Sequence, residues 1–183
     1  MSRIIDAGGA PVSLITNAAS STIKGLDLEI VARPSSNFDV SASYGYLDAK
    51  YDSYAFNATT NFSGTSLVRA PKHSVSTGVE WRIPFGDRDQ LTLRADYALL
   101  GDFFHEPGQG EIRFGTGIPL TAEDGYGLLD LRASYQHGPF RLTGYVNNVT
   151  DKEYRRTVNA LGSTVVGFAG TPRLYGLKIG YTY

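Results

Sequence analysis

Histidine is the residue type in this sequence best suited to metal chemistry, and it occurs at His73, His105 and His137. A metal ion needs ligands that converge on one point. The pattern of the chain places His73 at the start of a strand, His137 in a short turn and His105 in a long loop. We therefore predict no metal site and no cofactor. The neighbours His105 and Glu106 are the one pair that we would test for contact with a ligand.

Motifs for catalysis are absent from the sequence. It has no G-x-S-x-G elbow, no phosphate loop and no glycosidase-like pair of carboxylates. The run Gly115-Thr116-Gly117 lies in a predicted loop with no helix after it, so it is not a nucleotide motif. Cysteine is absent, which excludes a disulfide framework and a cysteine-based zinc site. The 17 Lys and Arg nearly balance the 18 Asp and Glu, so no strong electrostatic field favours nucleic acid, and we predict no nucleic-acid partner. From the missing motifs we also predict that the chain is not an enzyme.

The elements that would have to position any site are β-strands, because the main sequence pattern has a period of two residues. Between Leu91 and Leu99 every second side chain is apolar or aromatic, whereas Thr92, Arg94 and Asp96 lie between them. The same alternation recurs near residues 38–46, 75–83, 129–136 and 175–183. We predict an all-β chain, with no helix longer than a turn and with antiparallel strands near residues 2–6, 13–32, 38–52, 66–84, 90–104, 125–137, 140–154 and 164–183.

The predicted connections alternate between short and long. Short polar turns are expected near residues 33–37, 84–89 and 137–139, and long loops near 53–65, 105–124 and 155–163. Transmembrane barrels have this layout, with short turns at one rim and longer loops at the other. The loop rim meets the outside and carries the binding surface.

The sequence also indicates which face of each strand meets lipid. Tyrosine and tryptophan gather toward strand ends, as the aromatic belts of membrane barrels do. The apolar face has many small residues, which are poor material for a packed core. The other face carries mid-strand charges such as Glu80, Arg94 and Asp130, which a wet lumen accepts and hydrocarbon does not. A soluble barrel or sandwich with a solvated polar face is the alternative.

Four segments carry motifs in phase with these strands. Residues 146–154, VNNVTDKEY, resemble a V-x-N-L-x-D-x-x-Y pattern with Val149 in place of Leu, and residues 171–176, TPRLYG, resemble the P-R start of a last strand. Residues 23–29, IKGLDLE, resemble a G-x-E-x-E strand with Asp27 in place of the first Glu, and residues 70–73, APKH, resemble a P-x-H strand start. Taken in their order along the chain, the four motifs together resemble the C-terminal part of the barrel of TonB-dependent outer-membrane receptors, of the siderophore-receptor kind. The resemblance is carried by Gly25, Glu29, Pro71, Val146, Asn148, Asp151, Tyr154, Pro172, Arg173 and the final aromatic residue Tyr183.

The resemblance implies a place in the bacterial outer membrane. It also implies a barrel of about 22 strands, of which residues 1–183 would supply about eight as an open, incomplete part, with the strands near 2–6 and 164–183 as its free edges. A plug domain and a signal peptide match nothing here and would lie upstream. The implied partners are outer-membrane lipid and lipopolysaccharide, the barrel-assembly machinery through the C-terminal strand, TonB only through the missing plug, and a ferric-siderophore-like ligand of the full-length protein. The alternatives are a standalone porin-like barrel of about eight strands and a soluble ligand-binding β-barrel.

In such receptors ligand recognition falls to the outer loops, so the resemblance directs attention to aromatic and basic loop residues. Aromatic rings could stack on a chelate, and arginines could meet an anionic group. The loop candidates are Tyr54, Phe56, Phe103, Phe104, His105, Arg155 and Arg156. A second interpretation makes Tyr54 and Phe104 girdle residues, with Arg155 and Arg156 binding the phosphates of lipopolysaccharide.

Overall fold

The computed structural model describes residues 2–6, 11–15, 20–56, 59–108, 121–161 and 164–182. In these ranges the chain forms thirteen β-strands. None of the described residues belongs to a helix long and apolar enough to cross a membrane. The prediction of an all-β chain with antiparallel strands is confirmed.

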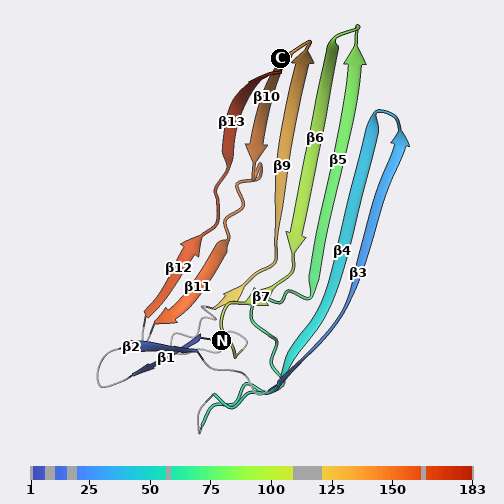
Figure 1. The fold of residues 1–183 in the computed structure, drawn as a ribbon. Coiled ribbons are helices and arrows are strands. Elements are labelled where there is room, and N and C mark those ends of the chain that lie inside the picture. The colour runs from blue at the N-terminus through green and yellow to red at the C-terminus, as the bar shows by residue number, and fades with distance from the viewer. Residues whose placement is uncertain are drawn as a thin grey trace.

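Seven of the strands form one antiparallel sheet in the order β13-β10-β9-β6-β5-β4-β3 (Figure 1). Their bounds are β3 Ser20–Ser35, β4 Phe38–Ser53, β5 His73–Phe85, β6 Asp89–Leu100, β9 Tyr126–His137, β10 Phe140–Asn147 and β13 Leu174–Tyr181. The chain passes up and down through these strands in sequence order. Strands β3 and β13 each pair on one side only, so the sheet is open within the described residues, as predicted for an incomplete part of a barrel.

The two ends of this sheet differ in their connections. At one end, called here the turn end, tight turns join β3 to β4, β5 to β6 and β9 to β10, and the C-terminus lies beside them (Figure 1). Gly86 and Gly138 occupy two of these turns at φ of 71° and 52°, which suits a residue without Cβ. At the other end, called the loop end, residues 54–72, 101–125 and 148–173 connect the strands. The predicted alternation of short and long connections is therefore confirmed.

Short strand pairs extend the loop end. Strand β1 (Ser2–Asp6) pairs with β2 (Pro11–Ile15), β7 (Phe103–Phe104) with β8 (Ala122–Glu123), and β11 (Arg155–Leu161) with β12 (Thr164–Ala169). Each pair is antiparallel and forms a separate two-stranded sheet. They account for the difference between the predicted number of strands and the observed one.

Several predicted boundaries are wrong for identifiable reasons. Residues 66–72 form no continuous strand, because Pro71 lacks an N–H and Arg69 has φ 53°, so β5 begins only at His73. The predicted loop at 155–163 includes β11, whose β-branched residues favour a strand despite its two arginines. The predicted strand at 164–183 is divided near Pro172.

Two further differences concern the first strands. The predicted strand at 13–32 is divided, because β2 ends at Ile15 and β3 begins at Ser20. Residues 2–6 pair with β2 in a sheet of their own, so the free edge opposite β13 is β3 and not the first strand. The strand predicted at 140–154 also ends early, at Asn147, where the contacts described below begin.

One face of the seven-stranded sheet is apolar and uncovered. The buried hydrophobic residues among those described, Ala49, Tyr51, Tyr54, Phe62 and Val158, all lie at the loop end. Large apolar side chains along the strands are exposed instead, including Trp81 at 52%, Leu142 at 47% and Ile179 at 83%. A soluble protein rarely leaves such a continuous apolar surface open, whereas the wall of a membrane barrel turns it toward lipid. We call this the lipid face.

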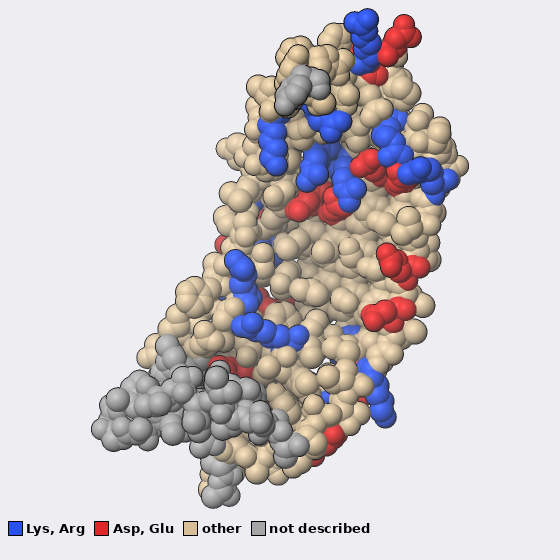
Figure 2. Space-filling view, in the orientation of Figure 1, with Lys and Arg blue, Asp and Glu red and all other residues tan. Residues whose placement is uncertain are grey.

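The opposite face carries the charges, and we call it the lumen face. Cross-strand register brings Asp39 opposite Glu80 and Glu80 opposite Arg94. Figure 2 shows acidic and basic side chains gathered on this side toward the turn end, above a middle region of mostly uncharged atoms. The alternation read from the sequence therefore corresponds to two distinct faces of one sheet.

Candidate ligand-binding site at the loop end

A cavity of about 480 Å³ lies on the lumen face where the sheet meets the loops. This volume falls in the range of small-molecule sites, about 300–1,000 Å³. The sheet contributes residues from β3, β4, β5 and β6, and the loop end contributes two arginines and an aromatic ring. The lining residues are Gly25, Asp27, Gly45, Tyr46, Leu47, Arg69, Pro71, Ser74, Leu100, Phe103 and Arg156.

Two glycines keep the sheet side of this cavity open. A Cβ added to Gly45 would lie 2.7 Å from the Ser74 hydroxyl oxygen and 3.2 Å from a carboxylate oxygen of Asp27. A Cβ added to Gly25 would lie 2.7 Å from the carbonyl oxygen of Tyr46. A larger residue at either position would displace its neighbours, so the glycine of the G-x-D-x-E motif shapes the cavity floor.

Arg69 ties the three long connections together. Its backbone N–H donates to the carbonyl of Phe104 at 2.8 Å, and its Nη2 donates to the Thr157 hydroxyl at 3.1 Å. With Arg156, which is exposed, it places two guanidinium groups at a cavity that has one carboxylate, Asp27. Sequence reasoning missed Arg69 because the alternating pattern assigned it to a strand. Pro71 was the available signal, because a proline within a run of strand-like residues argues against a continuous strand.

His105 lies beneath these loops and not in the cavity lining. Its side chain is fully buried, its ring meets Phe103 edge-on with centroids 5.0 Å apart, and its Nε2 lies 3.6 Å from Glu123 Oε2. Neither ring nitrogen has a hydrogen-bond partner among the described residues. Burial holds the pKa of His105 below its ordinary value, although the Glu123 carboxylate acts against this shift.

Arg155 is engaged by the same carboxylate. Its backbone N–H donates to Glu123 Oε1 at 2.8 Å and its Nε donates to Oε2 at 2.7 Å, while Nη2 donates to the carbonyl of Ala122. This contact fastens β11 to β8. The two adjacent arginines therefore differ in position, since Arg155 joins loops and Arg156 lines the cavity.

Tyr54 and Phe56 lie in a small core within residues 51–67. Tyr54 is 5% exposed and packs against Phe62 and Phe56, with ring centroids 5.5 Å and 6.3 Å away. Tyr51 completes this cluster, and Leu67 packs on it. Among the seven predicted loop residues, the structure brings Phe103 and Arg156 into the cavity lining, whereas Tyr54, Phe56, Phe104, His105 and Arg155 do not line it.

The motif residues after β10 hold the base of the third loop. Asn148 Nδ2 donates to the carbonyls of Lys152 and Thr171 at 3.0 and 3.1 Å, and Asn148 Oδ1 accepts from the Lys152 N–H at 2.8 Å. Asp151 accepts from the backbone N–H of Arg173 at 2.8 Å. Both Asn148 and Asp151 have positive φ, 49° and 53°, a conformation for which Asn and Asp are enriched.

Tyr154 and the glycine before the last strand complete this base. The Tyr154 hydroxyl accepts from the Thr171 N–H at 3.2 Å, and its ring stacks on Tyr126 with centroids 4.5 Å apart. A Cβ on Gly170 would lie 2.2 Å from the Tyr154 ring. We call the hydrogen bonds of residues 148–154 with 170–173 the loop-base contacts.

The remaining motif residues lie at separate places in the structure. Val146 lies on the lipid face in register with Leu131, Glu29 on the lumen face of β3, and Pro71 at the cavity. Pro172 precedes Arg173 in the loop-base contacts, and Tyr183 lies outside the described residues. Within the part of the chain that the structure describes, no three His, Cys, Asp or Glu side chains gather closely enough to hold a metal ion.

Comparison with known proteins decides the family. The family described as TonB dependent receptor-like, beta-barrel matches residues 2–149. This chain belongs to that family. Two curated members that it resembles are the ferrichrome outer membrane transporter and phage receptor of Escherichia coli, 26% identical over 136 residues, and the ferrioxamine B receptor of Salmonella typhimurium, 26% identical over 154 residues. The alignments cover 72% and 79% of this chain but 16% and 19% of those proteins, so the chain spans less than a fifth of their length.

Solved structures of ferric-siderophore receptors share the fold. The ferric yersiniabactin uptake receptor of Yersinia pestis aligns with a TM-score of 0.72 at 17% identity, over 88% of this chain and 23% of that one. The ferric preacinetobactin receptor of Acinetobacter baumannii aligns with a TM-score of 0.68 at 18% identity, over 99% of this chain and 25% of that one. The open sheet is therefore a portion of a TonB-dependent, siderophore-receptor-like barrel of the outer membrane, and the predicted family and location are confirmed.

Proposed function

We propose that the complete receptor takes up a ferric siderophore or a similar scarce chelate across the outer membrane. Energy would reach it from TonB through a plug domain outside residues 1–183. The proposal is supported by the family and by the names of the two curated relatives, which are a ferrichrome transporter and a ferrioxamine B receptor. In this proposal the seven-stranded sheet supplies part of the barrel wall and the loop end supplies part of the ligand site.

The cavity at the loop end is the observation that carries this proposal. It lies on the lumen face, where a ligand entering from outside would arrive, and Arg69 and Arg156 outnumber its single carboxylate Asp27. Guanidinium groups bind anionic oxygen ligands through short charge-assisted hydrogen bonds. Phe103 adds an aromatic ring on which a chelate could stack. An anionic, iron-loaded chelate matches this combination.

The other loop candidates then have a supporting role. Tyr54 and Phe56 stiffen the first loop through their aromatic core, and Arg155 fixes β11 against β8 through Glu123. Phe104 positions Arg69 by accepting its backbone N–H. We propose that these residues, with His105, shape the cavity that Phe103 and Arg156 line.

Three further partners belong to this proposal. Outer-membrane lipid would cover the lipid face, and lipopolysaccharide would surround the loop end. The barrel-assembly machinery would bind the C-terminal strand, of which β13 is the described part and Tyr183 the last residue. Among the described strands β13 pairs only with β10, so its other edge could serve such recognition by strand addition.

The test measures binding of a ferric siderophore to cells at a temperature that stops transport. In the full-length receptor, Arg69→Ala and Arg156→Ala should each weaken binding about tenfold, the lower range for a hydrogen bond to a charged group. Arg88→Ala removes an exposed arginine at the turn end and serves as the matched control. Unchanged binding in both cavity variants would remove the support for this site.

A further inference from the structure

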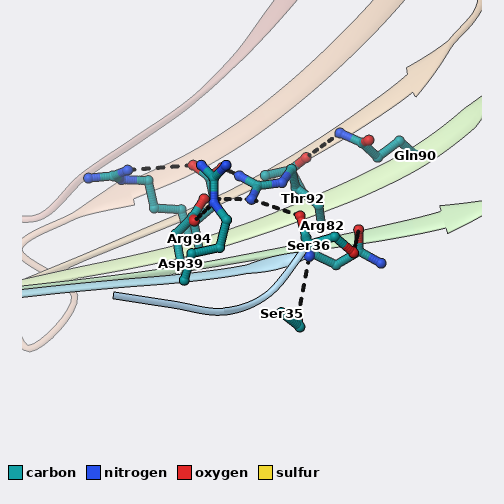
Figure 3. Close-up of polar contacts among 10 residues, drawn as sticks. Ser35, Ser36, Asp39, Arg82, Gln90, Thr92 and Arg94 are labelled. Carbon is teal, nitrogen blue, oxygen red and sulfur yellow. Dashed lines mark hydrogen bonds and ion pairs between the residues drawn. The ribbon is translucent and has the colours of Figure 1, made fainter. Parts of the chain in front are cut away.

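The ion pairs near the turn end of the lumen face join carboxylates to arginines. Asp39 lies 2.5 Å from Arg82, and Arg82 lies 2.6 Å from Glu80. Figure 3 shows Asp39, Arg82 and Arg94 converging there. Histidine is the one side chain whose unperturbed charge changes between about pH 5 and about pH 8. We therefore expect this network to keep its charges over that range.

A histidine takes part in the ion pairs at the loop end. The Glu123 carboxylate accepts the backbone N–H of Arg155 at 2.8 Å through Oε1 and its Nε–H at 2.7 Å through Oε2. Nε2 of His105 lies 3.6 Å from the same Oε2. The side chains of His105 and Glu123 are 0% and 7% exposed. One buried carboxylate therefore lies between a permanent cation and a group that becomes a cation in acid.

The buried ring of His105 is left without a hydrogen bond. Neither of its nitrogens has a partner among the described residues, although buried polar side chains usually have one. An apolar side chain would fill the same place without leaving two polar atoms unsatisfied. A buried group of this kind is found where a protein stores strain or performs a function, so the place of His105 beside Glu123 points to a role in the site.

His105 is connected on two sides to residues that line the loop-end cavity. Its ring meets the ring of Phe103, a lining residue, with centroids 5.0 Å apart. Through Glu123 it is coupled to Arg155, and the next residue in the chain is Arg156, which also lines the cavity. A rearrangement of His105 and Glu123 therefore reaches the cavity along both β7 and β11.

Protonation of His105 would upset the charge balance around it. The charged groups that act on the ring are Glu123 of β8, Arg155 of β11 and Arg69 in residues 54–72. Burial holds the pKa of His105 below its ordinary value and the two arginines add to this shift, whereas Glu123 opposes it. With a proton on His105, three cations share this one buried carboxylate. Because a buried charge without a partner is costly, the protonated ring competes with Arg155 for Glu123.

We propose that His105 and Glu123 are a pH-sensitive pair of positioning residues, which hold Arg156 at the cavity in a neutral medium and release it in an acid one. The proposal rests on the proposed function, because it concerns the regulation of the same cavity. In the closed arrangement His105 is neutral and Glu123 fastens Arg155. In the open arrangement protonated His105 takes the Glu123 carboxylate, and β11 is no longer fastened to β8.

The direction of the pH effect follows from proton uptake on opening. The closed arrangement disfavours the proton and the open one accepts it, so the closed arrangement has its full stability above about pH 6.5. Below that pH, the equilibrium constant for opening rises by up to about tenfold for each pH unit until the lowered pKa of His105 is reached.

The test is hydrogen–deuterium exchange of the full-length receptor in lipid nanodiscs, without any ligand. Mass spectrometry with fragmentation follows the Arg155 amide, which donates to Glu123, and rates are corrected for the pH dependence of exchange in an unstructured chain. Between about pH 7.5 and about pH 5.5 we expect this rate to rise about tenfold. The turn at residues 33–39, beside the ion pairs of Figure 3, should keep a constant rate.

Three variants assign the effect to its residues. His105→Leu removes the titrating group and should keep exchange at Arg155 slow at both pH values. Glu123→Gln removes the charge that holds Arg155 and should make exchange fast at both. His137→Gln is the matched control, because it removes a histidine that is 61% exposed at the turn end, and it should behave as the wild type does. Heat-modifiable migration on gels confirms folding, and His105→Gln replaces His105→Leu if the leucine variant does not fold.

Three results would overturn the proposal. They are a wild-type rate at Arg155 that does not change with pH, a pH dependence that persists without His105, and slow exchange in Glu123→Gln. Because the exchange experiment contains no ligand, it decides this proposal by itself. A receptor that binds no ferric siderophore in the preceding test would instead refute the proposed function and leave the exchange result unchanged.

Discussion

Leu131 offers the sharpest test of which face meets lipid. It lies near the middle of β9, in register with Ala95 and Val146, and 41% of its side chain is exposed on the lipid face. Replacing it with arginine puts a charge near the bilayer midplane, which costs about 2–4 kcal/mol. At about 1.4 kcal/mol per tenfold change, this lowers the folding equilibrium constant by about 30- to 700-fold.

The assay is reversible urea unfolding of the full-length receptor in lipid vesicles, followed by heat-modifiable migration on gels. Leu131→Ala measures the loss of apolar surface alone. Ser43→Arg places the same charge on the lumen face, where Ser43 lies opposite Glu29, and should cost less than about 1 kcal/mol. If Ser43→Arg destabilises the receptor more than Leu131→Arg does, the assignment of the two faces is reversed.

Three further predictions concern the loops and the C-terminus. Asn148→Ala removes three hydrogen bonds of a buried residue and should cost about 2–4 kcal/mol in the same unfolding assay. The pKa of His105 is lower in the folded state than its ordinary value of about 6.5. The stability that neutral His105 gives the folded loops is therefore fully present above about pH 6.5 and is lost as the pH falls toward the lowered pKa. Proteolysis of residues 101–125 should therefore rise in acid, and His105→Leu should abolish that dependence. Removal of Tyr183 should lower insertion into the outer membrane at native expression, measured by fractionation.

The sheet was largely predictable from the sequence because one of its faces is apolar, to meet lipid, and the other is polar, to meet the water of the lumen. Residues such as Leu93 and Arg94 alternate in polarity over the whole strand, and this alternation identified five of the seven wall strands, β4, β5, β6, β9 and β13. Strands were also predicted over most of the residues of β3 and over those of β10. Boundaries failed where another constraint acted. Pro71 delayed the start of β5, and the strand-forming residues of β11 lay in a segment whose arginines and asparagine looked like a loop.

The candidate site was only partly predictable, because it depends on contacts between distant segments. Phe103 and Arg156 were predicted from residue type and loop position, and both line the cavity. Arg69 was missed because its role depends on Thr157, which is 88 residues away in the sequence. Nothing in the local pattern distinguished Arg155, held by Glu123, from its neighbour at the cavity.

The loop-base contacts also have a consequence for variation among receptors. They bind the end of β10 to the start of β13 through side chains and backbone groups outside the β11–β12 hairpin, such as Asn148 with Thr171 and Asp151 with Arg173. The loop-base contacts therefore hold the ends of the β11–β12 hairpin together whatever the length of the hairpin. Insertions, deletions or a foreign epitope between residues 157 and 168 should leave the wall folded, and a lineage could acquire a new ligand by changing this hairpin alone.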